Sequence, residues 1–146
     1  MKKQITAIVA TLSLIVALTA IGIAGLVSTV TANIPFDFAI GGKTLPAGKY
    51  TVMKGTTQDM LIIQSADKGA AAGVITQSGN AKTEGKASLE FHRYGNQYFL
   101  AAVSDGIKVG ELPMTNAERK AARGKDNLAV NETKPEIVVV SATVGQ

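Results

Sequence analysis

The sequence contains no cysteine, no tryptophan and only one histidine among its 146 residues. Without cysteine there is no disulfide framework, no thiolate metal site and no cysteine nucleophile. A single histidine cannot supply the several imidazoles that converge in many zinc sites. Aromatic residues make up only 5% of the chain, so its core must be built mainly from Val, Ile, Leu and Ala.

Charge of either sign is sparse as well. The chain has 15 Lys and Arg against 11 Asp and Glu, a formal net charge of +4. Two of these basic residues, Lys2 and Lys3, precede a long hydrophobic run, and the rest of the chain carries 13 basic against 11 acidic side chains. This balance is too even to indicate nucleic acid binding. The few aromatic side chains also argue against the stacking platform that binds single-stranded nucleic acids.

The N-terminus has the pattern of an export signal. A basic start is followed by Ile5–Val27, a run of 23 residues without a charged side chain. The triplet Val30-Thr31-Ala32 then places small or modest residues at the positions that signal peptidases read. The sequence therefore predicts a signal peptide over 1–32 and a single domain over 33–146.

The length of the hydrophobic run leaves an alternative open. Signal peptides usually contain about 7–15 apolar residues, whereas a run of 23 is long enough to cross a bilayer as a helix. The leader would then stay in place as a membrane anchor over 5–27, with the domain on the outer side of the membrane. Gly22, Gly25 and the polar pair Ser28-Thr29 favour cleavage. In both cases we expect a periplasmic or extracellular domain.

The remaining chain has the pattern of an all-β domain. Short apolar or alternating segments recur about every 10–12 residues and are separated by Gly, Asn and Asp. In the opening segment Ile34–Val52, alternation places Phe36, Phe38 and Ile40 on one face of a strand, and Gly41-Gly42 suits a tight hairpin turn. We expect a small antiparallel sandwich or barrel of about seven to eight strands, preceded by the hydrophobic leader helix.

Two further elements are expected near the C-terminus. Thr115 to Glu118 form a capping box, in which the Thr hydroxyl accepts the N–H of Glu118 and the Glu carboxylate reaches back, so we predict a short helix over 115–123. A terminal strand is predicted over 136–144. Its continuous apolar run, Ile137–Val140, indicates either that both faces are covered or that the strand is prone to association. We expect it to pair beside an early strand.

The chain contains a set of motifs that occur together: Phe36-x-Phe38, Gly42-Lys43-x-Leu45-Pro46-Ala47-Gly48-x-Tyr50-x-Val52, Phe91-His92-Arg93-Tyr94-Gly95-x-Gln97-Tyr98-Phe99-Leu100 and Gly110-Glu111-Leu112-Pro113. With these motifs the chain resembles a family of small exported β-domain proteins that is abundant in Acidobacteria. The resemblance covers about residues 30–123 and implies export and a small β domain, but no activity, ligand or catalytic residue. One hairpin, L-P-A-G-K-Y-T-V, is also similar to a hairpin of prealbumin-like and carboxypeptidase-regulatory sandwich domains.

Candidate catalytic residues are few. His92 has only Glu90 near it on its own strand face, which favours a polar-face histidine over a metal ligand. Ser104 would need a base, and His92 is the one available. The nucleophile elbow, the phosphate-binding loop and the H-E-x-x-H motif are all missing from the sequence. We therefore predict a protein that is not an enzyme and that binds no cofactor or metal.

Two groups of residues are candidate contacts for a partner. Arg119, Lys120 and Arg123 could bind an anionic surface such as lipid headgroups or polysaccharide, although cations at a helix end are also typical of an ordinary solvated helix. Tyr94 and Tyr98, with the neighbouring Phe99, could form a stacking patch for sugars. The tripeptide Asn131-Glu132-Thr133 fits the pattern for N-glycosylation.

Three functions remain open at this point. The leading hypothesis is an exported, non-enzymatic β domain that acts as a structural or binding module of the cell envelope. The alternative is a self-assembling extracellular subunit that adds its terminal strand 137–144 to the sheet of a neighbouring copy. The third hypothesis is a carrier for a small ligand.

Overall fold

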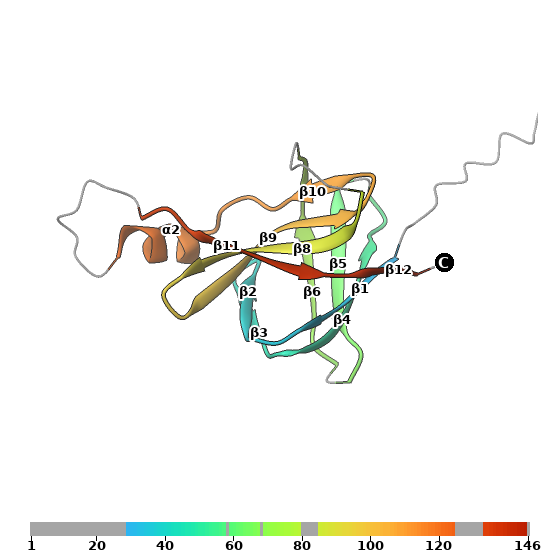
Figure 1. The fold of residues 1–146 in the computed structure, drawn as a ribbon, viewed down its shortest axis with the longest axis horizontal. Coiled ribbons are helices and arrows are strands. Elements are labelled where there is room, and N and C mark those ends of the chain that lie inside the picture. The colour runs from blue at the N-terminus through green and yellow to red at the C-terminus, as the bar shows by residue number, and fades with distance from the viewer. Residues whose placement is uncertain (1–28, 58, 68, 80–84, 125–132, 146) are drawn as a thin grey trace, which may run out of the picture.

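A computed structural model of the protein describes residues 29–57, 59–67, 69–79, 85–124 and 133–145. Within these residues, twelve strands and one short helix form two sheets (Figure 1). The first sheet has the order β12-β1-β4-β5-β6. Its strands are β1 (Thr29–Ile34), β4 (Gly48–Lys54), β5 (Met60–Ser65), β6 (Ala71–Ile75) and β12 (Thr143–Gly145).

The second sheet has the order β11-β8-β9-β10-β7, with a small hairpin, β2–β3, attached to β9. The connection of β2 to β9 is parallel, whereas the other pairs in both sheets are antiparallel. Its strands are β2 (Phe38–Ile40), β3 (Lys43–Leu45), β7 (Gln77–Ser78), β8 (Ala87–Tyr94), β9 (Gln97–Asp105), β10 (Val109–Glu111) and β11 (Glu136–Ser141). The helix, α2 (Asn116–Arg123), lies at one end of the molecule (Figure 1).

The core lies between the two sheets. Phe38 is its centre, because its ring lies 5.2 Å from that of Tyr50 in the first sheet and 5.4 Å from that of Phe91 in the second, both edge to face. The aliphatic side chains expected from the composition fill the remaining space, and the largest of those fully buried are Ile34, Ile63 and Leu89. The all-β sandwich predicted from the sequence is therefore confirmed.

The chain crosses from one sheet to the other at both sides of this sandwich. β6 and β7 end the two sheets on one side and are separated only by Thr76; β12 and β11 end them on the other and are separated only by Ala142. Thr76 donates both its N–H and its hydroxyl to the carbonyl of Asp59, at 2.6 and 3.2 Å. Ala142 donates its N–H to the carbonyl of Ala87, at 3.0 Å. At each corner the backbone N–H of the connecting residue is thus hydrogen-bonded where the chain passes from one sheet to the other.

The terminal strand differs from its prediction in two respects. It pairs beside an early strand, as expected, because β12 lies against β1, but its first part, β11, pairs with β8 in the other sheet. Its apolar run is not covered on both faces: Ile137 and Val139 are 50% and 60% exposed. The strands also outnumber the seven to eight expected, since corners and short excursions divide the chain into pieces of two or three residues.

The first strand begins upstream of the expected domain boundary at Asn33. β1 starts at Thr29 and lies between β12 and β4, in the interior of its sheet. Val30 and Ala32 are only 3% and 4% exposed and belong to the core. The three residues of β12 pair only with residues 29–31 of β1. Residues 29–32 are therefore part of the folded domain; the rest of the predicted leader lies outside the described residues.

A chain that begins at Asn33 should be less stable than one that begins at Thr29. It loses the buried side chains of Val30 and Ala32 and every pairing of β12, so we expect the free energy of unfolding to fall by about 3 kcal/mol or more. Urea titrations followed by circular dichroism measure this difference. Equal unfolding midpoints for the two chains would show that the core does not need residues 29–32.

The hairpin of the opening segment forms where the sequence predicts it. Gly41 and Gly42 have positive φ angles of 54° and 84°, which suit a tight turn between β2 and β3. Pro35, which has no N–H to donate, lies between β1 and β2, where the chain leaves the first sheet for the second. The single strand expected there is thus divided into two strands that belong to different sheets.

The turn before β4 is held by two hydrogen bonds. Tyr50 is fully buried, and its hydroxyl donates to the carbonyl of Pro46 at 2.6 Å. The carboxylate of Asp37 accepts the N–H of Ala47 at 2.8 Å. Burial and, to a lesser extent, the negative charge of Asp37 raise the pKa of Tyr50, so the phenol stays protonated and remains a donor. The Leu-Pro-Ala-Gly-Lys-Tyr pattern therefore fastens a turn to the core.

Replacing Tyr50 with Phe should cost about 1 kcal/mol of unfolding free energy, because it leaves the Pro46 carbonyl without its donor while it preserves the packing of the ring. Thermal unfolding followed by circular dichroism measures the change. Tyr50→Leu is the companion variant, and it should cost more because it also removes the edge-to-face contact with Phe38. Unchanged stability of Tyr50→Phe would mean that the hydrogen bond does not hold the turn.

Candidate functional site: an apolar pocket beside a buried histidine–glutamate pair

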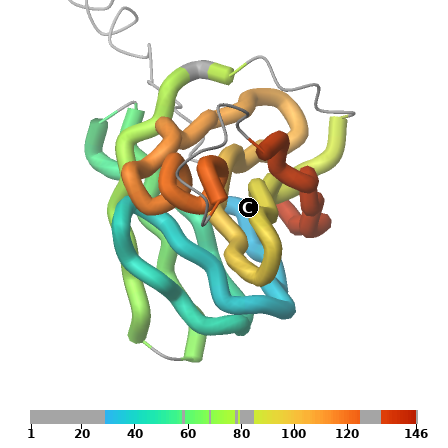
Figure 2. Tube along the Cα trace, turned by 90° about the vertical axis from the view of Figure 1, so that its left-hand side faces the viewer, coloured from blue at the N-terminus to red at the C-terminus, as the bar shows by residue number. Residues whose placement is uncertain are grey.

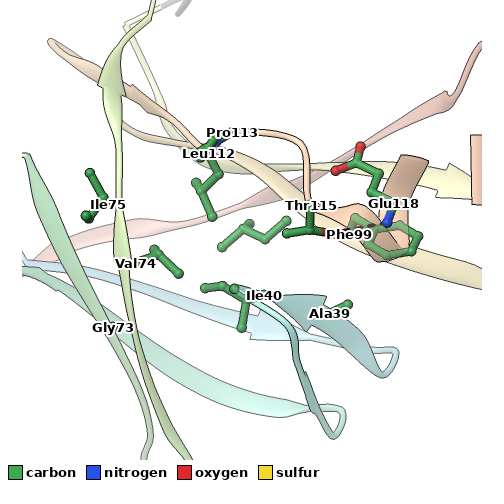
Figure 3. A pocket seen from close by; sticks show the side chains of 12 residues that line it. Ala39, Ile40, Gly73, Val74, Ile75, Phe99, Leu112, Pro113, Thr115 and Glu118 are labelled. Atoms are coloured by element: carbon green, nitrogen blue, oxygen red, sulfur yellow. Dashed lines mark hydrogen bonds between the residues drawn. The ribbon is translucent and has the colours of Figure 1, made fainter. Parts of the chain in front are cut away.

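An apolar pocket with a volume of about 250 Å³ lies where β2, β6 and β9 meet the start of α2. Its walls come from β2, β6, β9, the segment 112–115 and the first turn of α2. Figure 3 shows Leu112, Val74 and Ile40 pointing into it from three different elements. Ile75 and Pro113, which also line the pocket, are exposed, and Ile75 is 72% exposed. The pocket is therefore reached from the protein surface.

A glycine allows two strands to approach closely at the floor of the pocket. A Cβ atom on Gly41 would lie 2.8 Å from Cγ1 of Val74, and one on Gly73 would lie 2.9 Å from Cε of Met60. Gly41, in the turn after β2, therefore allows β2 to approach β6 closely, and its positive φ also favours glycine. The contact at Gly73 is with the terminal methyl of the flexible Met60 side chain on β5, which can move aside.

The helix α2 closes the far end of the pocket. Its N-cap is Thr115, whose hydroxyl accepts the N–H of Glu118 at 3.2 Å, and Gly124 ends the helix with a positive φ of 69°. The helix is short and depends on the sheet for stability. Ala122 packs against Phe99 and Tyr94 on the outer face of the second sheet, and Figure 2 looks at the sandwich from this end.

A hydrogen bond between a half-buried histidine and a buried glutamate makes the second contact between α2 and the sheet. Oε1 of Glu118 lies 2.7 Å from Nδ1 of His92 on β8, and the side chains are 5% and 26% exposed. The hydrogen bond that Glu118 accepts from His92 raises the pKa of His92; partial burial opposes this effect, and the charges of Glu118 and Glu90 add to it. The capping box predicted that the Glu118 carboxylate reaches back to the start of the helix. It bonds instead to His92 on β8.

The site therefore combines an apolar cavity with hydrogen-bond acceptors at one end. Most of the lining is aliphatic or glycine, with Phe99 as the aromatic wall. Thr115 and Glu118 are the polar residues of the lining, and both belong to the start of α2 (Figure 3). A carboxylate bound on one oxygen by His92 can still accept from a second donor. This arrangement suits a compact apolar group that carries a hydroxyl or amino group at one end.

The structure separates the partner contacts that were predicted together. Arg119, Lys120 and Arg123 are all exposed on α2, and Arg119 also donates to the carbonyl of Met114 at 3.3 Å. The two tyrosines lie in different clusters: Tyr94 is 8% exposed and packs under α2, whereas Tyr98 stacks on Phe36 with ring centroids 3.9 Å apart. They do not present a common face for sugar stacking.

Other candidates from the sequence have structural roles. The hydroxyl of Ser104 accepts the N–H of Gly106 at 3.0 Å, and the carboxylate of Asp105 accepts two backbone N–H groups in the same turn. Asn131 of the glycosylation pattern lies outside the described residues. In the part of the chain that the structure describes, no three His, Asp or Glu side chains converge to hold a metal ion. No helix among those residues is long and apolar enough to cross a membrane.

Comparisons with protein-family models, curated proteins and solved structures give no match to this chain. The resemblance to exported proteins of Acidobacteria remains a prediction.

Sequence reasoning did not find the pocket or the partner of His92. The pocket residues come from segments that are each ordinary strand or turn sequences, and only the fold brings them together. Glu118 lies 26 residues from His92, and its place in a capping box offered a sufficient local explanation. The available signal was a single histidine on a strand face and an acidic residue on a helix too short to be stable alone.

The His92–Glu118 pair should make stability depend on pH. Because the folded-state pKa of His92 is raised, the extra stability is present below about pH 6.5, the ordinary pKa, and is lost as the pH rises through the folded-state value. We expect His92→Gln to remove this dependence and to cost about 1 kcal/mol at pH 5.5 but less at pH 8.5. Urea titrations at the two pH values measure it. Glu90→Gln removes only the smallest contribution to the raised pKa of His92, so it should leave most of the dependence in place. A larger cost at pH 8.5 would contradict the assignment.

Proposed function

We propose that this protein is an exported, non-enzymatic binding module of the cell envelope and that it binds a small apolar group in the pocket beside α2. The observation that carries the proposal is the pocket itself, an apolar cavity open to solvent with acceptors at one end. Concave apolar sites with a few converging polar groups are the usual form of a ligand site. Export is supported by the basic and hydrophobic N-terminus of the sequence.

The size of the pocket limits the ligand. An apolar cavity of about 150 Å³ admits benzene, so the 250 Å³ found here can hold one ring with a short substituent, or a branched aliphatic group of similar size. Thr115 and Glu118 favour a ligand whose polar end donates a hydrogen bond, and the Glu118 carboxylate disfavours an anionic one. A free small molecule and the side chain of an envelope protein are both compatible with this chemistry.

Titration of isotope-labelled protein with phenol, toluene and benzoate tests the proposal by nuclear magnetic resonance. We expect phenol to shift the amide signals of Gly73, Val74 and Thr115 with a dissociation constant of about 1 mM, which is typical of a ligand with so few atoms. Toluene should bind more weakly because it has no donor, and benzoate should bind least. Signal shifts scattered over the surface would contradict the proposed site. Tighter binding of benzoate than of phenol would contradict it as well.

Two variants that each introduce a phenylalanine, one inside the pocket and one outside it, provide the control. Leu112→Phe adds a ring inside the pocket and should abolish the phenol shifts, whereas Ile107→Phe adds the same ring at a residue that is 85% exposed and away from the pocket. Circular dichroism should show that both variants keep the fold. Phenol shifts that persist unchanged in Leu112→Phe would place the binding elsewhere. Export is tested separately by fractionation of cells that express the full chain.

A further inference from the structure

The edge of the second sheet at β11 is free and apolar. Among the described residues β11 pairs with β8 alone, and it ends the strand order of its sheet. Ile137 and Val139, which are 50% and 60% exposed, point to the outer face of this edge. Sheet edges of this kind are usually blocked by a lysine, a proline or a bulge within the strand. β11 reads Glu-Ile-Val-Val-Val-Ser and pairs with β8 in one continuous register, so it has none of these protections.

The register determines which backbone groups face away from β8. Ala142 donates its N–H to Ala87, and the pairing continues without a shift from Ser141 with Ser88 to Glu136 with Arg93. In an antiparallel pair the residues whose N–H and C=O groups bond to the partner alternate along the strand. Residues 136, 138 and 140 therefore bond to β8, as Ala142 does. Ile137, Val139 and Ser141 direct their N–H and C=O groups to the open side.

These three residues form a self-complementary ladder. The row of backbone groups that face the open side is bounded by Pro135, which has no N–H, and by the corner at Ala142, where the chain leaves the sheet. Its midpoint is Val139. An antiparallel second copy centred there pairs Val139 with Val139, and Ile137 with Ser141 twice, which uses every open group on both strands. A two-fold contact of this kind closes as a dimer, whereas a parallel pairing would not.

The charges on this edge do not oppose such a pairing. No charged side chain lies between Ile137 and Ala142, so no like charges would face each other across the ladder. The nearest acid, Glu136, is paired with Arg93 at 3.1 Å. On the inner side, Val138 and Val140 would meet their counterparts from the other copy. We propose that two copies of this chain associate through antiparallel pairing of β11 about Val139.

Cross-linking in cells that express the full chain tests the proposal. The chain has no cysteine, so Val139→Cys introduces a single thiol on the expected two-fold axis. With a short bismaleimide we expect covalent dimers several-fold in excess of those formed by Ile107→Cys, because position 107 is more exposed than position 139 but lies off this edge. Equal yields from the two variants, or no dimer from Val139→Cys, would overturn the proposal.

Two substitutions distinguish edge pairing from any other source of proximity. Ser141→Pro in the Val139→Cys background removes an N–H that points to the open side, so the β8 ladder stays intact while the yield of dimer should fall to that of Ile107→Cys. Ile137→Lys in the same background should do the same without restricting the backbone. Thermal unfolding confirms that each variant is folded. Dimer yields unaffected by both substitutions would contradict the β11 contact. The result is independent of ligand binding in the pocket.

Discussion

The structure depends on two chain segments, β6–β7 and β11–β12, that each pass directly from one sheet to the other. A sandwich is normally held together by side chains between its layers, but here the backbone itself passes from one layer to the other at Thr76 and at Ala142. The sheets cannot slide apart without breaking the hydrogen bonds of these corners. This restraint suits a chain that is poor in large aromatic side chains and has no disulfide, because neither a bulky core nor a covalent link fixes the layers.

The two features with functional potential lie beside these corners. The pocket is lined by the end of β6, just before the chain turns toward β7, and by Glu118 of α2, which pairs with His92. Where β11 turns toward β12, the strand leaves its sheet before another strand can cover its open side. Binding and association are thus proposed at the opposite sides of the sandwich, and each proposal can fail without the other.

Most of the fold could be predicted from local sequence patterns. Alternation predicted the strands that hold Phe38, Tyr50 and Phe91, glycine pairs predicted turns, and the capping box predicted the start of α2. The division of the opening and terminal segments between two sheets was not predictable, because a strand that changes sheets has the same period as one that does not. For the apolar run 137–140 the sequence left two alternatives, coverage on both faces or a strand prone to association, and the exposure of Val139 excludes the first. The pocket depends on distances between segments and leaves no local pattern.

The pairing of β1 with β12 has a consequence for the order of folding. Thr29 lies opposite Gly145, so β1 obtains its second neighbour only when β12, far along the chain, is available. Contacts of such long sequence separation form slowly because the loop must close before they contribute. The domain therefore stays incomplete until β12 has been synthesised, and its first and last strands then lie side by side.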